Sequence, residues 1–354
     1  MLSKEEIDYY QRQISLSDFG INSQTILKQA SILVIGAGGL GCPALQYLAA
    51  AGVGTIGIAD FDKVSISNLH RQTIYTFSDV GKYKTDCAKK FLQNLNPHIN
   101  IDTYRTIVSD ENILALIEPY DLVLDCTDIN FVKYLINDAC VHLGKPWIYG
   151  SVYKNEGNIC FFDNTSSNTT LRCLFPETDD DLPSCSEVGT LGIVPGITGM
   201  LMAQEAIHFF TKSQLVLQNE LLIFNASDFS ISKIKFESSW DGRKQSFLRF
   251  SKNAPTYIIT PSDLKNKISQ IQLIDVRSYE EREKSSLGGI HIPLDELNER
   301  LDEIDTNAET VVYCAHGIRS KNAVDFLKNE GFRNIKSLEG GLHLWNLEYV
   351  NANF

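Results

Sequence analysis

The sequence predicts an α/β protein of two domains: a doubly wound domain, whose sheet has helices on both faces, followed by a smaller α/β domain. Three observations support this prediction. Strand-like apolar runs alternate with helical patterns from residue 31 to 151, a polar and broken stretch covers residues 240–255, and a shorter alternation follows it. We therefore expect one domain at residues 1–250 and a second at residues 251–354.

The elements of the first domain follow from local patterns. Short apolar runs predict strands at residues 32–35, 55–59, 99–104 and 122–124. Apolar residues at helical spacing predict helices at residues 40–51, 84–95 and 132–143. Because strands and helices alternate, the sheet should be largely parallel and covered on both faces.

The remaining elements are shorter and less regular. Residues 165–187 form a polar stretch, and a loop of this length is usually functional or disordered. Around it we expect a strand, a helix and two further strands, at residues 158–163, 197–210, 221–224 and 231–236. The second domain should hold two strands and a helix, at residues 273–276, 311–313 and 319–330.

Composition excludes several classes of protein. A formal net charge of −12 argues against a broad basic face for nucleic acid, so we expect no nucleic-acid partner. No apolar run reaches the roughly 18 residues that span a membrane, and the first residues lack the pattern of a signal peptide. The eight cysteines are scattered singly, which indicates reduced thiols. We therefore expect a cytoplasmic protein without membrane contact.

A glycine-rich turn stands between the first predicted strand and the first predicted helix. Gly36, Gly38 and Gly41 have the spacing of a Rossmann-like nucleotide-binding turn, with Gly39 between them, and Asp60 ends the next strand. Glycines let the backbone approach a phosphate, and the carboxylate can accept hydrogen bonds from ribose hydroxyls. This motif alone fits an NAD-dependent oxidoreductase as well as an enzyme that uses ATP.

Charged and amide residues downstream favour a triphosphate over a nicotinamide cofactor. They are Asp60, Asp62, Asn68, Arg71, Gln72, Lys84 and Asp128. Arg71 and Lys84 can neutralise phosphates and Asp128 can hold magnesium. Hydride transfer requires none of these groups.

Residues 5 to about 238 resemble the ThiF/MoeB/HesA superfamily, relatives of the ubiquitin-activating enzymes. The motifs that carry this resemblance are Tyr10-Gln11-Arg12-Gln13-Ile14, Gly36-Ala37-Gly38-Gly39-Leu40-Gly41-Cys42, Asp60-Phe61-Asp62, Asn68-Leu69-His70-Arg71-Gln72, Gly81-Lys82-Tyr83-Lys84 and Asp125-Cys126-Thr127-Asp128. The resemblance implies that ATP and magnesium are used to adenylate the C-terminal glycine of a small ubiquitin-like protein. It also implies that Arg71 and Lys84 contact phosphates, Asp60 the ribose and Asp128 magnesium. Arg12 would reach the phosphates from the partner subunit of a homodimer.

Two cysteine segments bear on this resemblance. Cys185 lies in a segment, Pro183 to Gly196, that resembles the family's catalytic-cysteine segment, where a thiolate could take an acyl group or exchange persulfide. Many members also bind structural zinc with two Cys-x-x-Cys pairs. Here Cys173 stands alone, with Thr170 in its partner's place, and the second pair is absent between about residues 235 and 247. We expect no zinc site, because one cysteine cannot supply four ligands.

Residues 256–354 resemble a rhodanese domain. The motifs that carry this resemblance are Leu273-Ile274-Asp275-Val276-Arg277, Gly289-Ile290-His291-Ile292-Pro293-Leu294, Cys314-Ala315-His316-Gly317-Ile318-Arg319-Ser320 and Gly340-Gly341-Leu342-His343-Leu344-Trp345. A strand, a short loop and a helix start form a cradle that favours a thiolate. The resemblance implies that Cys314 carries a persulfide, stabilised by the loop amides of Gly317 and Ser320 and by Arg319. A related phosphatase would need five residues between cysteine and arginine, and this loop has four.

The two resemblances together predict an ATP-dependent adenylyltransferase fused to a sulfurtransferase, whose product is a thiocarboxylate on a ubiquitin-like carrier ending in Gly-Gly. The sulfur donor would be a cysteine desulfurase or thiosulfate. Alternatives are activation of another carboxylate, on a small molecule, peptide or RNA, and non-catalytic binding of a ubiquitin-like protein. The pathway stays open among thiamine, molybdopterin, tRNA thiolation and other sulfur-bearing metabolites.

Overall fold

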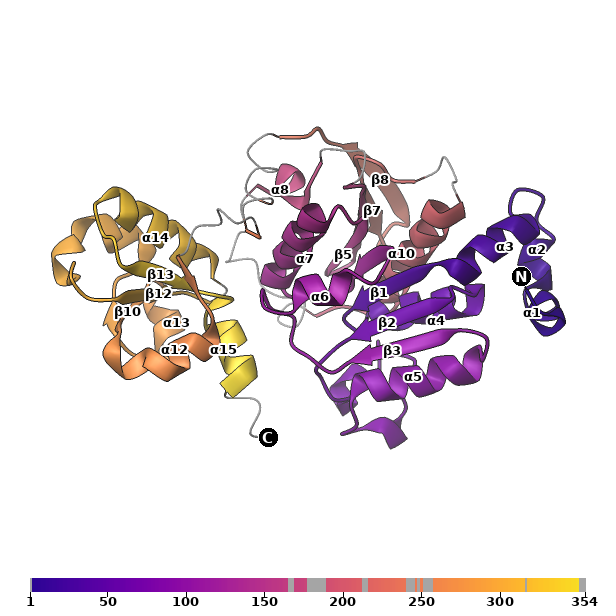
Figure 1. The fold of residues 1–354 in the computed structure, drawn as a ribbon, viewed down its shortest axis with the longest axis horizontal. Helices are drawn as coiled ribbons and strands as arrows, with labels where there is room; N and C mark the ends of the chain where they lie inside the picture. Colours follow the sequence, from indigo (N-terminus) through magenta and orange to yellow (C-terminus); the bar gives the residue numbers. More distant parts are fainter. Residues whose placement is uncertain are drawn as a thin grey trace. The chain divides into compact units, whose positions relative to one another are not determined.

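The computed structural model describes residues 2–164, 169–176, 189–211, 216–239, 246, 249–250, 257–315 and 317–349. These residues form two compact units, one up to residue 250 and one from residue 257 (Figure 1). Each unit contains one sheet, of eight strands in the first and five in the second. No helix in the described ranges is long and apolar enough to cross a membrane.

Three short helices open the first unit: α1 (Lys4–Tyr9), α2 (Gln11–Ile14) and α3 (Gly20–Gln29). Ser3 begins α1 with a capping box, and buried Glu6 accepts a hydrogen bond from Lys28 of α3 at 2.7 Å. The Tyr10 hydroxyl accepts a hydrogen bond from Asn96 at 2.8 Å. These contacts tie the three helices to the body of the unit, although the sequence patterns did not predict the helices.

The eight-stranded sheet has the order β3-β2-β1-β4-β5-β6-β7-β8. Five strands run parallel: β1 (Ser31–Ile35), β2 (Thr55–Ala59), β3 (Asn100–Tyr104), β4 (Leu122–Asp125) and β5 (Trp147–Tyr153). Three follow antiparallel: β6 (Glu156–Phe162), β7 (Glu220–Asn225) and β8 (Ser230–Lys235). The fold class is the one predicted, a doubly wound α/β sheet, here extended by an antiparallel edge.

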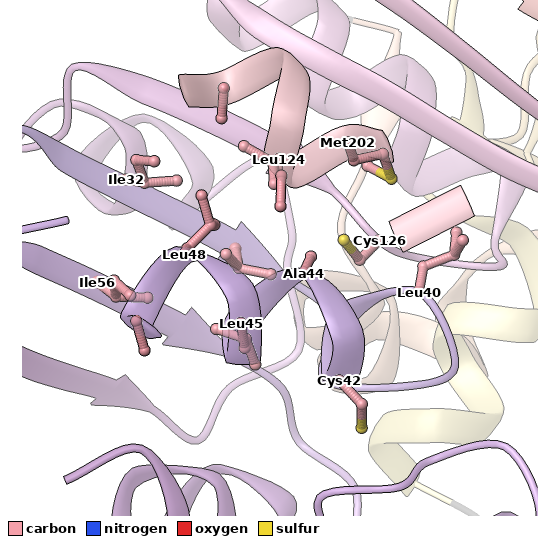
Figure 2. Close-up of a cluster of buried hydrophobic side chains, with 14 of the residues drawn as sticks. Ile32, Leu40, Cys42, Ala44, Leu45, Leu48, Ile56, Leu124, Cys126 and Met202 are labelled. Atoms are coloured by element: carbon pink, nitrogen blue, oxygen red, sulfur yellow. The ribbon is translucent and has the colours of Figure 1, made fainter. Parts of the chain in front are cut away.

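Helices cover this sheet: α4 (Gly41–Ala51), α5 (Lys84–Leu95), α6 (Ile113–Ile117), α7 (Asn130–Leu143) and α10 (Ile193–Thr211), with the short α8 (Leu171–Leu174) near its edge. The largest core cluster lies between the sheet and helices α4 and α10, where Leu45 and Leu48 of α4 and Met202 of α10 meet Ile32 and Leu124 of the central strands (Figure 2). These side chains are fully buried, and at about 25 cal/mol per Å² of apolar surface their burial is the main stabilising contribution.

Strand register places the loops that carry the predicted nucleotide residues side by side. Ile35 of β1 pairs with Ala59 of β2 and with Asp125 of β4, so the three strands end at the same level. The loops that leave them, at residues 36–40, 60–83 and 126–129, therefore start together at the carboxyl edge of the sheet. Ligands of open α/β sheets bind at this edge.

The second unit has a parallel sheet of order β11-β10-β12-β13-β9. Its strands are β9 (Ile258–Ile259), β10 (Gln272–Asp275), β11 (Ile290–His291), β12 (Thr310–Tyr313) and β13 (Ile335–Leu338). Its helices are α12 (Pro261–Lys267), α13 (Tyr279–Lys284), α14 (Ile318–Asn329) and α15 (Gly341–Tyr349). Separate apolar clusters pack around the sheet, one including Val312 and Leu327 and the other including Val311 and Trp345.

Candidate active sites

The glycine-rich loop joins β1 to α4 and depends on glycine at two positions. Gly36 has φ +95°, and a Cβ there would lie 2.7 Å from the carbonyl oxygen of Cys126. A Cβ at Gly41 would collide with the carbonyl oxygen of Gly36. Gly38 and Gly39 are less confined, with nearest neighbours at 3.6 Å and 3.2 Å from an added Cβ. Gly36 and Gly41 therefore determine the shape of the turn. Gly38 and Gly39 leave its outer surface without side chains, so that a ligand can approach the backbone.

Asp60 holds this loop from the end of β2. Its carboxylate accepts hydrogen bonds from the N–H of Ala37 at 2.7 Å and from the N–H of Asp62 at 2.8 Å. Burial raises the pKa of Asp60, against the attraction of Lys84. Each carboxylate oxygen can accept a further hydrogen bond, which suits the ribose contact that the sequence predicts.

Lys84 begins α5, and its ammonium group is buried beside two carboxylates. Its Nζ lies 2.8 Å from Oδ2 of Asp62. Burial opposes the charge of Lys84, but the attraction of Asp60 and Asp62 outweighs it and raises the pKa. The structure thus keeps a charged ammonium in the loop region, paired with Asp62.

Asn68 ends the short 3-10 helix η1 (Ile66–Asn68), and Arg71 and Gln72 lie on the turn that follows it. The Asn68 side chain accepts a hydrogen bond from the Ser65 N–H. The backbone carbonyl of Asn68 accepts from the N–H groups of Arg71 and Gln72, so Asn68 shapes the turn. Arg71 donates to the carbonyl of Ser67 at 2.9 Å. Gln72 is 4% exposed and faces Gly38, and its Oε1 is buried with no hydrogen-bond partner within the described residues. Such an orphaned oxygen fits a site that receives a donor from a ligand.

Asp128 lies on the loop beside Gly36. Thr127 donates its N–H and its hydroxyl to buried Asp125, at 3.0 Å and 2.7 Å, and Lys133 pairs with Asp125 at 2.9 Å, which fixes the loop. Asp128 itself is exposed. The described ranges contain no group of three metal-binding side chains. An exposed carboxylate such as that of Asp128 is the kind of ligand that magnesium takes together with substrate phosphates and water.

Arg12 does not join the loop of its own chain. It is exposed on α2, where the neighbouring Tyr10 packs on Gly52 and Gln13 donates to the carbonyl of Ala51 at 2.8 Å. Residues 51–54 lead into β2, so α2 lies at the amino end of the strands. The glycine-rich loop lies at their carboxyl end.

Cys185 lies outside the described residues, which resume at Gly189. A Cβ at Gly192 would collide with the carbonyl oxygen of His70 and would lie 3.1 Å from Cα of Arg71. Pro195 of α10 would lie 3.2 Å from a Cβ at Gly39. The described part of this segment therefore lies against the loop that carries Arg71 and against the glycine-rich loop.

Cys173 lies in a hydrogen-bonded cluster. Its sulfur is 3.4 Å from the Thr170 hydroxyl and accepts from the N–H of Ser239 at 3.3 Å. Burial opposes ionisation, but hydrogen bonds from Ser239 and Thr170 outweigh it and lower the pKa of the thiol. Thr170, which stands where the sequence comparison expects a second cysteine, and Ser239 are therefore the hydrogen-bond partners of the Cys173 sulfur.

The other cysteines of the first unit, Cys42, Cys87, Cys126, Cys140 and Cys160, are buried in the core, as predicted. Burial raises the pKa of the Cys42 thiol to about 12. A neutral buried thiol is a poor nucleophile, so these side chains act as small apolar groups.

In the second unit, the Cys314 sulfur lies between the end of β12 and the start of α14. It accepts a hydrogen bond from the N–H of Gly317 at 3.0 Å and lies 3.5 Å from the hydroxyl of Ser320. Gly317 has φ +94° and comes directly before α14. Ser337 of β13 bonds to Ser320 at 2.8 Å and extends this network, although the sequence patterns did not single it out.

Arg319 is engaged by a carboxylate. Its two terminal nitrogens donate to the two oxygens of Glu281, both at 2.8 Å. Burial opposes the charge of Glu281, but the Arg319 hydrogen bonds and the Ser278 N–H outweigh it and lower the pKa of Glu281 to about 2. The guanidinium charge predicted to stabilise the sulfur is therefore shared with Glu281.

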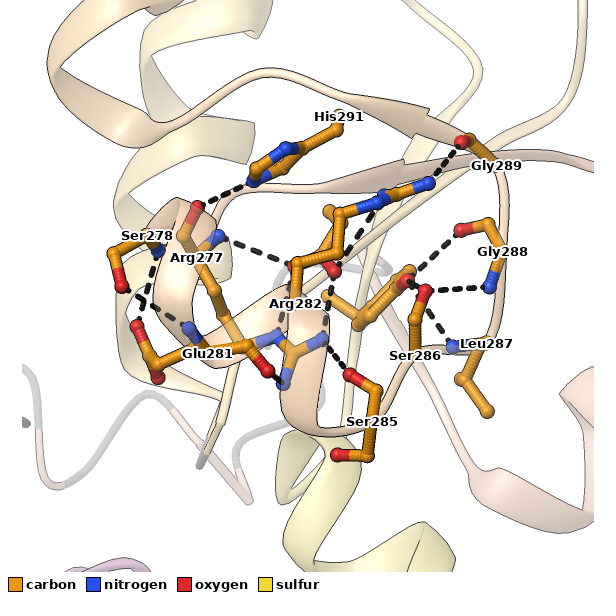
Figure 3. Close-up of polar contacts among 12 residues, drawn as sticks. Arg277, Ser278, Glu281, Arg282, Ser285, Ser286, Leu287, Gly288, Gly289 and His291 are labelled. Carbon is orange, nitrogen blue, oxygen red and sulfur yellow. Dashed lines mark hydrogen bonds and ion pairs between the residues drawn. The ribbon is translucent and has the colours of Figure 1, made fainter.

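The segment that carries Glu281 is itself held firmly. Arg277 forms a buried ion pair with Asp275 at 2.7 Å and donates to the carbonyl of Ser285 at 2.6 Å (Figure 3). Arg282 donates to the carbonyl of Gly289, and His291 bonds to the carbonyl of Arg277. These contacts fix helix α13 against β10, so Glu281 offers Arg319 a rigid partner.

Comparisons with known proteins cover both units. The ThiF family model matches residues 10–242, and the model of the rhodanese-like domain matches residues 260–348. The adenylyltransferase and sulfurtransferase MOCS3 of Culex quinquefasciatus is 35% identical, over 97% of this chain and 88% of its own length. The probable adenylyltransferase/sulfurtransferase MoeZ of Mycobacterium tuberculosis is 36% identical, over 97% and 94%. The sulfur carrier protein adenylyltransferase of Thermus thermophilus is 43% identical, over 66% and 88%.

Solved structures share the fold. PaaA matches with a TM-score of 0.59 at 23% identity, over 67% of this chain and 75% of its own. Escherichia coli MccB with ATP matches with a TM-score of 0.56 at 20% identity, over 68% and 80%.

Proposed function

Because the chain belongs to the ThiF family and ends in a rhodanese-like domain, we propose that it adenylates the C-terminal glycine of a ubiquitin-like sulfur-carrier protein and then makes a thiocarboxylate with sulfur carried on Cys314. The curated relatives that match nearly the whole chain are adenylyltransferases and sulfurtransferases, and this protein is an enzyme of the same kind. The observation that carries the proposal is the presence in one chain of a glycine-rich cradle with buried Lys84 and of a thiol held by the amide of Gly317.

The first reaction needs positioning and charge neutralisation. The carrier's terminal carboxylate attacks the α-phosphorus of ATP, and pyrophosphate leaves with the electron pair of the broken P–O bond. No proton has to be removed, so no general base is required. Lys84 and Arg71 offset the charge of the phosphates, the free amides of the glycine-rich loop donate to phosphate oxygens, and Asp128 would hold magnesium against them.

The second reaction transfers sulfur. The terminal sulfur of the Cys314 persulfide attacks the acyl carbon and AMP leaves, which gives an acyl disulfide between the carrier and Cys314. A thiolate, for which Cys185 is the proposed source, then attacks the Cys314 sulfur and releases the thiocarboxylate, leaving a Cys185–Cys314 disulfide. A dithiol reductant restores both thiols. A cysteine desulfurase or thiosulfate would reload Cys314.

The proposed assembly is a homodimer in which Arg12 serves the partner's nucleotide site. Two features support it. Arg12 lies at the amino end of its own sheet, and the first 21 residues and α4 carry exposed apolar side chains, namely Ile7, Tyr9, Leu16, Ile21 and Tyr47. A second copy would cover these side chains. The free cysteines of the described ranges suit a reducing compartment such as the cytoplasm.

ATP–pyrophosphate exchange with candidate carriers ending in Gly-Gly tests the first reaction. The intact mass of the carrier, after addition of thiosulfate or a persulfide donor, tests the second. We expect exchange with one carrier and a mass gain corresponding to replacement of oxygen by sulfur, and the carrier's identity then distinguishes thiamine, molybdopterin and tRNA thiolation pathways. Absence of exchange with every carrier would contradict the proposal and favour activation of a small carboxylate or a binding role.

A further inference from the structure

The peptide between Ala37 and Gly38 is held by a tyrosine that no motif of the sequence singles out. The hydroxyl of Tyr75 donates a hydrogen bond to the carbonyl oxygen of Ala37 at 2.9 Å, and the Cys42 thiol lies 3.5 Å from the same oxygen. In the preceding peptide, between Gly36 and Ala37, the N–H of Ala37 donates to Asp60 at 2.7 Å. Tyr75 is 5% exposed, so its ring is fixed in the core.

The orientation of this carbonyl determines where the next amide points. All described peptides are trans, and in a planar trans peptide the C=O of one residue and the N–H of the next point in opposite directions. Because Tyr75 draws the Ala37 carbonyl into the core, the N–H of Gly38 must point away from it. Within the described part of the chain, the N–H groups of Gly38, Gly39 and Leu40 have no hydrogen-bond acceptor.

A rotated peptide would lose this donor. If the Ala37–Gly38 plane turned over, the carbonyl oxygen would face the position of the phosphate and would repel it. This rotation turns ψ of Ala37 and φ of Gly38, and Gly38 has no side chain that restricts its φ. The hydrogen bond from the Tyr75 hydroxyl is therefore the contact that fixes the plane, with the Cys42 thiol beside it.

We propose that Tyr75 is a positioning residue for adenylation, which holds the Ala37 carbonyl inward so that the Gly38 amide is preorganised to donate to a phosphate of ATP. The reaction named here, adenylation, rests on the proposed function, whereas the effect on ATP binding can be measured without it. Tyr75 touches no substrate in this arrangement, since it acts through the backbone. The effect should therefore fall on the binding of ATP and not on that of the carrier.

The test is Tyr75→Phe, with Tyr120→Phe as its matched control. Tyr120 is equally buried, at 2% exposure, and its hydroxyl bonds to Tyr104 at 2.9 Å and to Asp102 at 3.3 Å, without contact to the glycine-rich loop. Both changes remove one buried hydroxyl and leave the ring. ATP binding is measured by calorimetry, the KM for ATP and for the carrier by pyrophosphate exchange, and the melting temperature by calorimetry.

We expect Tyr75→Phe to weaken ATP binding and to raise the KM for ATP by about five- to tenfold, the size of one lost hydrogen bond, with the carrier's KM unchanged. Tyr120→Phe should leave both unchanged at a similar loss of melting temperature. Equal ATP affinity in the two variants would overturn the inference. If Tyr75→Phe does not fold, Cys42→Ala must raise the KM for ATP by about twofold, and an unchanged KM would overturn it.

Failure of the proposed function gives a different result. In that case the native enzyme shows no exchange with any carrier, and the calorimetric comparison of ATP binding still decides the role of Tyr75.

Discussion

The glycine-rich cradle of the first unit and the cysteine loop of the second are built from the same parts. Each follows a parallel strand, contains a glycine with positive φ and precedes a helix. They differ in how their polar groups are satisfied. In the cradle, the amides of Gly38 and Gly39 and the Oε1 of Gln72 lack partners within the described residues. In the cysteine loop, the amide of Gly317 already donates to the sulfur.

This difference fits the two groups that the proposed function assigns to the sites, a nucleotide and a persulfide sulfur. A nucleotide arrives and leaves, so its site must present donors that only the ligand satisfies, from loops on three strands. A persulfide sulfur stays attached to its cysteine, so a single loop can hold it. The comparison therefore predicts that changes in one site should leave the half-reaction of the other intact.

Replacing Cys314 should have the largest effect. Cys314→Ala removes the atom that carries sulfur, so thiocarboxylate formation should fall by more than about 10³-fold while pyrophosphate exchange stays within twofold of the native rate. Intact mass of the carrier and exchange measure the two. Cys173→Ala, which removes a partly exposed thiol of the first unit, is the control and should retain both reactions. Loss of exchange in Cys314→Ala would contradict the independence of the two sites.

Lys84→Met should have the converse effect, because it should impair the adenylation half-reaction and leave the chemistry of Cys314 unchanged. It removes the buried ammonium 2.8 Å from Asp62, and a lost charge contact to a phosphate should lower kcat/KM for ATP by about 10²- to 10³-fold. Alkylation of Cys314 by iodoacetamide should keep its native rate. A variant that exchanges pyrophosphate at the native rate would remove Lys84 from the nucleotide site.

Buried Glu205 of α10 and half-buried Glu281 of α13 should give the two units opposite pH dependence, and Glu205 gives the larger effect. Burial raises its pKa to about 7, against the hydrogen bond it accepts from Leu217 N–H. A raised carboxyl pKa means that the folded state binds more protons, so this contribution to stability decreases as pH rises from about 4.5 through about 7. Glu205→Gln should raise the free energy of unfolding at pH 8 by about 2 kcal/mol. Calorimetry at pH 5 should show a smaller gain, and equal gains would refute the assignment.

Glu281 should give the smaller effect with the opposite sign. Its pKa is lowered to about 2, so its contribution is present above about pH 4.5 and is lost as pH falls toward 2. Glu281→Gln should destabilise the second unit at pH 7 by about 1 kcal/mol, after allowance for its partly exposed side chain. The uncompensated Arg319 should also lower the pKa of Cys314, seen as alkylation that begins at lower pH. An unchanged alkylation profile would show that Arg319 does not influence the sulfur.

Local patterns predicted most of the fold because the hydrophobic period of each helix or strand depends only on consecutive residues. Helix α5 lies at its predicted bounds, and strands β1, β2 and β4 differ from prediction by at most one residue. The helices α1–α3 and strand β5 were not predicted. Helices α1 and α2 are too short for a clear period, and the contacts that hold the three helices to the unit, such as Glu6 to Lys28 and Tyr10 to Asn96, join residues far apart in sequence.

The same reason limits what the sequence says of the sites. Motif spacing singled out Gly36, Asp60 and Cys314 as candidates because each belongs to a recognisable local sequence pattern. Glu281 and Ser337 act on the cysteine loop from 38 and 17 residues away in sequence, and Tyr75 acts on Ala37 from 38 residues away. No periodicity links such pairs, since only the folded sheet brings them together.

The close packing of Gly192 links the segment before α10 to the loop that carries Arg71. Its backbone rests directly on His70 and Arg71, with no room for even a methyl group. A movement of Gly192 must therefore displace the backbone of His70 and Arg71, and a movement of that backbone must displace Gly192. Because Gly192 comes directly before α10, this contact couples the loop that carries Arg71 to the start of that helix.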